Sequence, residues 1–305
     1  MSKIQEALKR LQDSGTPEAK ELGNAGEISS QLAGLELDPS NEDDPGGEKA
    51  RSVTVHIDQA TLRAACLIAP DYHDRMLADQ YRDIKRPLIA NALGKRGMQV
   101  ERGNLVMVTS AIAGEGKTFS SLNLALSISQ EQDLSVLLVD ADVAKSHIST
   151  VLEVADMPGL LDFLDTGGDD IESLLVPTDL DGLAILPAGG KRENATELLS
   201  GSRMEWLAHH LAFVDKHRIV IFDTPPLLQT SEAKAIAHMA GQIVLIVKAE
   251  STSQAAVLEA LHVLEGEEKP VNLVLNQARD MGAGRSYEYG YGYRYGEIAT
   301  RDGPG

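Results

Sequence analysis

The most informative part of this chain reads Leu105-Val-Met-Val-Thr-Ser-Ala-Ile-Ala-Gly-Glu-Gly-Lys-Thr118. An apolar run leads into a glycine-containing loop, and Lys117 and Thr118 open a helical pattern. The loop matches the P-loop pattern G-x-x-x-x-G-K-S/T, except that Ala111 replaces the first glycine. In P-loops, backbone N–H groups and the helix N-terminus hold phosphates, the lysine reaches the β and γ oxygens, and the hydroxyl can ligate Mg²⁺. The segment therefore predicts a phosphate site at a strand–loop–helix corner.

Short apolar runs rich in β-branched residues alternate with helical patterns over most of the chain. Several of these runs are apolar throughout, which is typical of strands that are buried on both faces of a parallel sheet. The alternation predicts a doubly wound, mainly parallel α/β sheet, whose ligands bind beyond the carboxyl ends of the strands. The helical patterns include Lys117–Gln130 and Ser253–Glu265. The expected strands are Leu105–Thr109, Val136–Asp140, Leu183–Leu186, Ile219–Asp223, Gln242–Val247 and Val271–Asn276.

Aspartates follow two of these expected strands. Asp140 and Asp142 are two residues apart at the end of one strand, so they lie on the same side. Asp223 ends another strand, which Pro225 and Pro226 then stop. A single aspartate in this position can be no more than a cap or turn residue. Three of them beside a P-loop predict the metal-holding carboxylates of a nucleotide site.

Composition excludes some classes of protein. The 305 residues would make two average domains, or one large α/β unit with disordered ends. Acidic residues outnumber basic ones by 46 to 28, and the net charge of −18 argues against a nucleic-acid partner. The single cysteine, Cys66, cannot form an internal disulfide, which fits a reducing compartment. Apolar runs such as Ile243–Val247 are far shorter than the ~20 residues of a membrane span. We therefore expect a cytoplasmic protein.

The chain divides into three expected segments. Residues 1–50 combine a short amphipathic pattern, Met1–Gln12, with a flexible tether rich in glycine, proline and acid. Residues 51–280 are expected to form a single P-loop domain. Residues 281–305 are expected to form a flexible tail, because glycines weaken any strand there. This tail carries five of the seven tyrosines: Tyr287, Tyr289, Tyr291, Tyr293 and Tyr295.

These motifs together resemble the bacterial tyrosine kinases (BY-kinases) of polysaccharide export and chain-length control. The chain is most similar to the exosortase-associated tyrosine autokinase branch. The resemblance rests on the P-loop, Asp140-Ala-Asp142, Asp223-Thr-Pro-Pro-Leu-Leu228 and the tyrosine cluster. It implies a P-loop NTPase domain, a three-layer sandwich of MinD/ParA-like type. It also implies an ATP- and Mg²⁺-dependent protein-tyrosine autokinase that phosphorylates its own tail and regulates exopolysaccharide synthesis or export.

The resemblance assigns roles to individual residues. Lys117, Asp140, Asp142 and Asp223 would be catalytic, with Asp142 as the base for a tyrosine hydroxyl. Mg²⁺ would be held by Thr118, Asp140 and Asp223. The nucleotide would be bound by Ala113, Gly114, Glu115, Gly116, Lys117, Thr118 and Phe119. Lys145 stands where the family has an arginine, and it keeps the charge but loses the bidentate fork. Separately from the resemblance, Asn276 at the end of the last strand could reach an adenine, or it could cap the following turn.

The resemblance also implies partners. Asp79, Arg82 and Lys85 are a softened form of the Glu-x-x-Arg-x-x-Arg helix that assembles a ring of subunits in this family, although a charged helix face is often only solvated surface. Related kinases are often fused to a membrane-spanning chain-length regulator, whereas this sequence shows no membrane span. We therefore expect a separate membrane activator that holds this chain at the inner membrane.

Two other functions compete with the kinase. A partitioning-type ATPase switch typically has a lysine early in the P-loop, where this chain has Ile112, and often ends in an amphipathic membrane helix rather than in tyrosine and glycine. A non-catalytic nucleotide-binding scaffold of the export machinery is disfavoured because all three aspartates are present. We expect the kinase.

Overall fold

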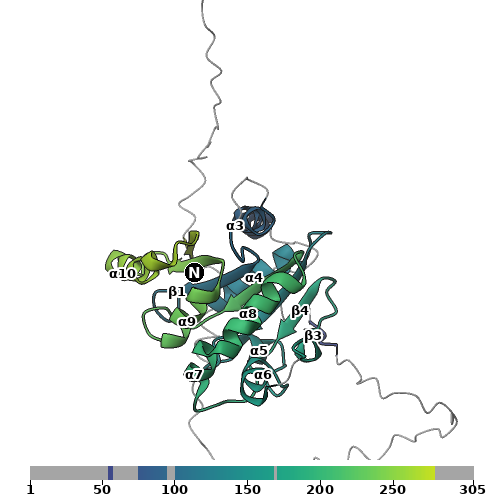
Figure 1. Cartoon of the computed structure of the whole chain (residues 1–305). Coiled ribbons are helices and arrows are strands. Elements are labelled where there is room, and N and C mark those ends of the chain that lie inside the picture. The colour runs from purple at the N-terminus through teal and green to yellow at the C-terminus, as the bar shows by residue number, and fades with distance from the viewer. Residues whose placement is uncertain (1–53, 58–74, 95–99, 168–169, 279–305) are drawn as a thin grey trace, which may run out of the picture.

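The computed structural model describes residues 54–57, 75–94, 100–167 and 170–278 (Figure 1). The expected segments 1–50 and 281–305, with the amphipathic pattern and the tyrosine cluster, lie outside the described residues. Among the described helices, none is both long enough and apolar enough to cross a membrane.

A seven-stranded sheet organises the domain, in the order β3-β4-β2-β5-β1-β6-β7. All neighbouring strands are parallel except β3 and β4, which confirms the expected mainly parallel sheet. The strands are β1 (Leu105–Ser110), β2 (Ser135–Asp140), β3 (Val176–Pro177), β4 (Leu183–Leu186), β5 (Arg218–Asp223), β6 (Gln242–Lys248) and β7 (Val271–Asn276).

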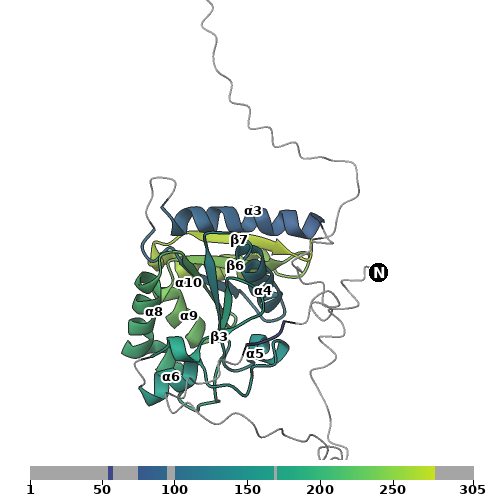
Figure 2. The ribbon, with the colours of Figure 1, turned by 90° about the vertical axis from the view of Figure 1, so that its right-hand side faces the viewer.

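Helices cover both faces of the sheet and make the expected three-layer sandwich. Figure 2 shows the strands between α8 and α9 on one side and α4 and α5 on the other. One core cluster joins the sheet to α6–α10, and the other joins it to α3, α4 and α5. The helices are α3 (Arg75–Ala92), α4 (Lys117–Ile128), α5 (His147–Val151), α6 (Leu160–Thr166), α7 (Ala195–Ser200), α8 (Ser202–Val214), α9 (Ser231–Met239) and α10 (Gln254–Leu264), with short 3₁₀ turns at Glu172–Leu174 and Glu265–Glu267.

The central strands are buried on both faces, as their apolar sequences predict. In β1, Met107 belongs to one core cluster and Val108 to the other, because successive side chains point to opposite faces. The edge strand β7 differs, since Leu273 and Leu275 are exposed. Burial on two faces therefore distinguishes the strands that carry the P-loop and the aspartates from the edge of the sheet.

The expected element boundaries differ from the observed ones by one or two residues. Each expected strand lies within an observed one, extended by at most one residue at either end. The helix expected to end at Gln130 ends at Ile128. The helix expected from Ser253 begins at Gln254, because the Ser253 hydroxyl accepts a hydrogen bond from the backbone N–H of Ala256 and caps the helix. The short antiparallel strand β3 was not expected.

Candidate active site

The candidate site lies where β1, β5 and β2 end side by side. These strands are neighbours in the sheet and run parallel, so their carboxyl ends meet at one edge. Asp140 of β2 and Asp223 of β5 are direct register partners. The P-loop leaves the end of β1, and α4 begins at Lys117. The fold thus brings together the P-loop and aspartates that are more than 80 residues apart in sequence.

Two glycines give the P-loop its conformation. Gly114 and Gly116 have φ angles of 82° and 93°, in the left-handed region that favours glycine. A Cβ atom on Gly116 would clash with Nδ2 of Asn276, whereas one on Gly114 would meet open space. Glycine at position 116 therefore suits both the backbone angle and the contact with the Asn276 side chain.

Glu115 holds the loop in place. Its buried carboxylate accepts hydrogen bonds from the backbone N–H of Ile112 at 2.8 Å and from that of Lys248, at the end of β6, at 3.4 Å. It also accepts a hydrogen bond from the hydroxyl of Thr252. The Glu115 side chain thus fastens the P-loop to the neighbouring strand, which leaves its backbone as the part that can face a phosphate.

Lys117 is buried at the first position of α4. Burial lowers the pKa of its ammonium group, while the negative charges of Asp223 and Asp142 oppose this shift. A bound anionic ligand would add to the negative charge around this ammonium group and favour its protonated form. This agrees with the role that the P-loop pattern predicts.

Asp223 is fully buried and receives two hydroxyl hydrogen bonds. Thr118 donates to one carboxylate oxygen and Ser121 to the other, each at 2.8 Å. Burial, followed by the nearby charge of Asp140, raises the pKa of Asp223 to about 7. Thr118 and Asp223, two of the three residues expected to hold Mg²⁺, are thus in direct contact.

Only one of the two carboxylate oxygens of Asp140 accepts hydrogen bonds. Its Oδ2 atom accepts hydrogen bonds from the backbone N–H of Ser149 at 2.8 Å and from the Ser149 hydroxyl at 2.7 Å. Its Oδ1 atom is buried and has no hydrogen-bond partner. Burial raises the pKa of Asp140 to about 6, although the bonds from Ser149 oppose the rise. One oxygen of Asp140 is therefore free to serve a ligand or a cation.

These residues fit a Mg²⁺ ion that arrives with a nucleotide. Within the described ranges, no group of three or more His, Cys, Asp and Glu side chains could hold a metal by itself. Proteins usually bind Mg²⁺ through one or two carboxylates together with substrate phosphates. Adjacent acids with raised pKa values, one with an unpartnered oxygen, would be stabilised by such a cation.

The other expected site residues differ in their burial and in their contacts. Asp142 is buried and close enough to interact electrostatically with Lys117, as is the exposed Lys145. Ala113 is exposed at the loop, whereas the half-buried Phe119 packs into the core shared by α3 and α4.

Asn276 contacts the P-loop from the end of β7. Its Nδ2 atom donates to the backbone carbonyl of Glu115 at 2.9 Å, and its Oδ1 atom accepts from the N–H of Gln277. It therefore caps the following turn, which is one of the two roles considered for it. The contact with an adenine stays a prediction.

The three charged residues of α3 that were expected to assemble a ring do not share one environment. Asp79 and Arg82 are exposed and form an ion pair with each other. Lys85 was expected to share a ring interface with them, but it is buried. Its ammonium donates to the carbonyl of Ser127 at 2.6 Å and pairs with Glu131 at 2.7 Å. Lys85 therefore points toward α4, whereas Asp79 and Arg82 face outward, and the role of all three residues in assembling a ring stays a prediction.

Sequence reasoning missed two residues that orient the acids. Ser121 lies one helical turn after Thr118, so the 3.6-residue period of the helix places it toward Asp223 and could have indicated it. Ser149 lies on the separate helix α5, and no sequence spacing connects it with Asp140. Only the folded structure identifies Ser149.

Comparisons with known proteins show the family of the chain. Residues 104–276, more than half of the chain, match a family model described as an AAA domain. EpsB of Ralstonia solanacearum is 34% identical over 199 residues, which cover 65% of this chain but only 26% of EpsB. Tyrosine-protein kinase YwqD of Bacillus subtilis is 31% identical over 187 residues, which cover 61% of this chain and 76% of YwqD. The solved kinase domain of the Escherichia coli tyrosine kinase ETK matches with a TM-score of 0.59 at 28% identity, covering 70% of this chain and 80% of that domain.

Proposed function

Because the chain belongs to the AAA domain family and, within it, to the bacterial tyrosine kinases, we propose that it is an ATP-dependent protein-tyrosine autokinase. It transfers the γ-phosphoryl group of ATP to tyrosines of its own C-terminal cluster. Through this reaction it regulates the synthesis or export of an exopolysaccharide. The observation that carries the proposal is Asp142, a buried carboxylate beside Lys117 that makes no hydrogen bond to another described side chain.

The chain's own residues bind and orient the nucleotide. The P-loop backbone between Ala113 and Thr118 holds the phosphates, and the buried Lys117 neutralises the charge on their outer oxygens. Thr118, Asp140 and Asp223 would hold Mg²⁺, which neutralises further negative charge on the phosphates when bound. Ser121 and Ser149 orient the two acids through the hydrogen bonds described above.

The transfer needs little covalent help from the protein. The phenol oxygen of the acceptor forms a bond to the γ-phosphorus while the bond from that phosphorus to the β–γ bridging oxygen breaks, and ADP leaves. The phenol proton passes to the carboxylate of Asp142. A phenol with a pKa of ~10 requires only modest assistance in a site of this kind. The kinase thus depends mainly on positioning and on neutralising charge.

The tail is proposed as the substrate because of its tyrosines and its reach. The eleven residues from Asn276, at the end of β7, to Tyr287 can span up to ~36 Å at ~3.3 Å per residue. That length supports transfer to a neighbouring subunit in a ring. Asp79 and Arg82 on the exposed face of α3 are the proposed ring contacts, and a separate membrane protein is the proposed activator at the inner membrane.

An anti-phosphotyrosine assay with MgATP tests the proposal. The wild-type protein should become phosphorylated, alone or with a candidate activator, and Lys117→Met should not. Lys216→Met, which changes an exposed lysine away from the site, is the matched control and should behave as wild type. If the wild-type protein hydrolyses ATP and dimerises with it but forms no phosphotyrosine, the proposal fails in favour of a partitioning-type switch.

A further inference from the structure

A cavity of about 720 Å³ is lined in part by the segment that follows Asp142, and Lys145 is the residue of its lining already discussed above. One wall is formed by Lys145 and Ser146, which follow Asp142 by three and four residues. Another part of the lining comes from Gly190 and Lys191, in the loop that follows β4. The cavity therefore opens at the carboxyl edge of the sheet, beyond β2 and β4, and its size falls within the range of ligand pockets.

The order of the strands places this cavity on one particular side of the phosphates. From β7 to β4 the edge presents Asn276, the P-loop of β1, Asp223 of β5, the aspartates of β2 and then the cavity. Asp142, the proposed base, is thus on the cavity side of Lys117. A group that gives its proton to Asp142 would approach from the cavity.

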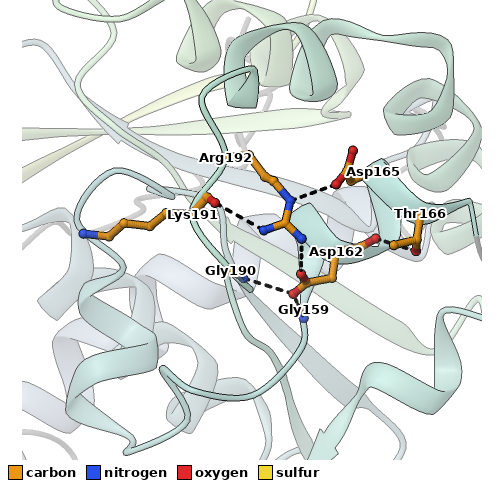
Figure 3. A network of polar contacts seen from close by, with 7 residues as sticks. All are labelled: Gly159, Asp162, Asp165, Thr166, Gly190, Lys191 and Arg192. Carbon is orange, nitrogen blue, oxygen red and sulfur yellow. Dashed lines mark hydrogen bonds and ion pairs between the residues drawn. The ribbon is translucent and has the colours of Figure 1, made fainter.

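The cavity presents positive charge in a strongly acidic chain. Lys145 and Lys191 are exposed, and neither forms an ion pair within the described part of the chain. Figure 3 shows the Lys191 side chain extending away from the network around Arg192. Asp156 is the exposed carboxylate in the lining. The two ammonium groups, unpaired among the described residues, are the groups in the lining with which an acidic side chain of a ligand can pair.

The second acid of the lining, Asp162, is paired, although it shares its guanidinium partner with Asp165. Arg192 pairs with Asp162 at 2.8 Å and with Asp165 at 2.8 Å (Figure 3). The carboxylate of Asp162 also accepts hydrogen bonds from the backbone N–H groups of Gly159 at 2.9 Å and of Gly190 at 3.0 Å. These contacts fix the loop that bears Lys191 and occupy both carboxylate oxygens of Asp162.

The same loop is joined to the catalytic centre through Ser149. The Ser149 hydroxyl donates to Asp140 at 2.7 Å and accepts from the backbone N–H of Ala188 at 3.1 Å. Ala188 lies three residues before Lys191. The wall of the cavity is therefore held in a defined position relative to the acids of the active site, as a preformed binding site requires.

We infer that this cavity binds the tyrosine-bearing acceptor segment and that Lys191, assisted by Lys145, selects tyrosines flanked by an acidic residue. The inference rests on the proposed kinase function and specifies the substrate class of the same site. The tail supplies a built-in contrast: Glu288 separates Tyr287 from Tyr289, whereas Arg294 separates Tyr293 from Tyr295.

Site-resolved mass spectrometry of the full chain during reaction with MgATP tests the inference. The measured quantity is the rate at Tyr287 and Tyr289 relative to the rate at Tyr293 and Tyr295. Lys191→Glu should lower this ratio by about two- to fivefold, which corresponds to the loss of one partly exposed ion pair. Lys191 is the better target than Lys145, because Lys145 also acts on the charge of Lys117.

Two controls make the result specific. Lys216→Glu should leave the ratio unchanged, because it alters the charge of the chain equally but lies outside the cavity lining. Exchanging the tail charges, with Glu288→Arg and Arg294→Glu together, should lower the ratio in the wild-type domain and restore it partly in Lys191→Glu. This exchange separates charge selection from the distance of each tyrosine to the domain.

The outcomes distinguish the inference from the function on which it rests. If phosphotyrosine forms but the ratio is the same in wild type and Lys191→Glu, charge selection by this cavity is wrong and the kinase stands. If the wild-type chain forms no phosphotyrosine with MgATP and activator, the kinase proposal fails and this inference fails with it. Thermal unfolding of each variant shows whether a changed ratio comes from a folded domain.

Discussion

Asp140 and Asp223 lower the free energy of unfolding of this fold when their buried carboxyl groups are ionised. They are register partners on adjacent strands, and burial raises both pKa values, to about 6 and about 7. Without a bound cation, the folded protein retains protons on these acids that the unfolded chain releases near pH 4. The free energy of unfolding should therefore fall as the pH rises from about 4 through about 7.

Asp140→Asn should stabilise the protein in EDTA without nucleotide at pH 8. The asparagine oxygen can accept the hydrogen bonds from Ser149, and its amide group adds no charge beside Asp223. At ~1.4 kcal/mol for each pKa unit, the gain at pH 8 is about 3 kcal/mol, and it should vanish near pH 4. Urea unfolding of both proteins between pH 4 and 8 measures this. Parallel curves would show that Asp140 does not carry the raised pKa, and the variant should also lose autophosphorylation.

At the scale of elements, the packing of α3 on α4 gives two basic residues of α3 different environments: Lys85 is buried and Arg82 is exposed. Lys85 bonds to the carbonyl of Ser127 in the last turn of α4 and to Glu131 just beyond it. A positive charge at the C-terminal end of a helix is favourable, and this lysine is almost entirely buried. Arg82, three residues earlier, pairs only with the exposed Asp79 among the described residues.

Lys85→Met should therefore lower the free energy of unfolding by about 1–3 kcal/mol, because a buried carbonyl loses a charged donor. Arg82→Met, the matched change on the same helix, should alter stability by less than ~0.5 kcal/mol. Chemical unfolding gives both values. In sedimentation velocity, Arg82→Met should weaken the proposed ring although the domain keeps its stability. Equal loss of stability in the two variants would contradict the burial of Lys85.

At the scale of the whole molecule, charge connects phosphorylation with assembly. The chain has a net charge of −18, and each phosphate adds about −1.5 to −2. Phosphorylation of all five tail tyrosines would add roughly −8 to −10, which increases the repulsion between neighbouring subunits. We expect the phosphorylated protein to dissociate, and added salt to restore assembly in part by screening.

Sedimentation velocity of the phosphorylated protein against a variant with all five tail tyrosines changed to phenylalanine measures this effect. The phenylalanine variant keeps the size and apolar character of the tail but cannot gain charge. An equally large oligomer in both samples would rule out the charge switch, although it would leave the kinase activity unaffected.

Local sequence signals were enough to predict every strand of the sheet except β3, and the P-loop at the end of β1. Apolar runs identified the strands that are buried on both faces, because a side chain that meets a helix layer on either side must be apolar. The P-loop glycines and Lys117 lie within four residues of one another, so their geometry is local. Asp140 and Asp223 were also identified, because a residue that ends a parallel strand must lie at the edge where ligands bind.

The remaining features depend on which elements become neighbours, and the tertiary structure alone decides that. The position of β2 beside β5 makes Asp140 and Asp223 register partners and raises their pKa values. The packing of α3 on α4 buries Lys85, which the sequence presents as one more charge on a polar helix. The loop after β4 reaches Ser149 and places Lys191 at the cavity, although no sequence motif links these residues. Burial and pairing are properties of contacts between distant segments, and their energies exist only once the sheet has assembled.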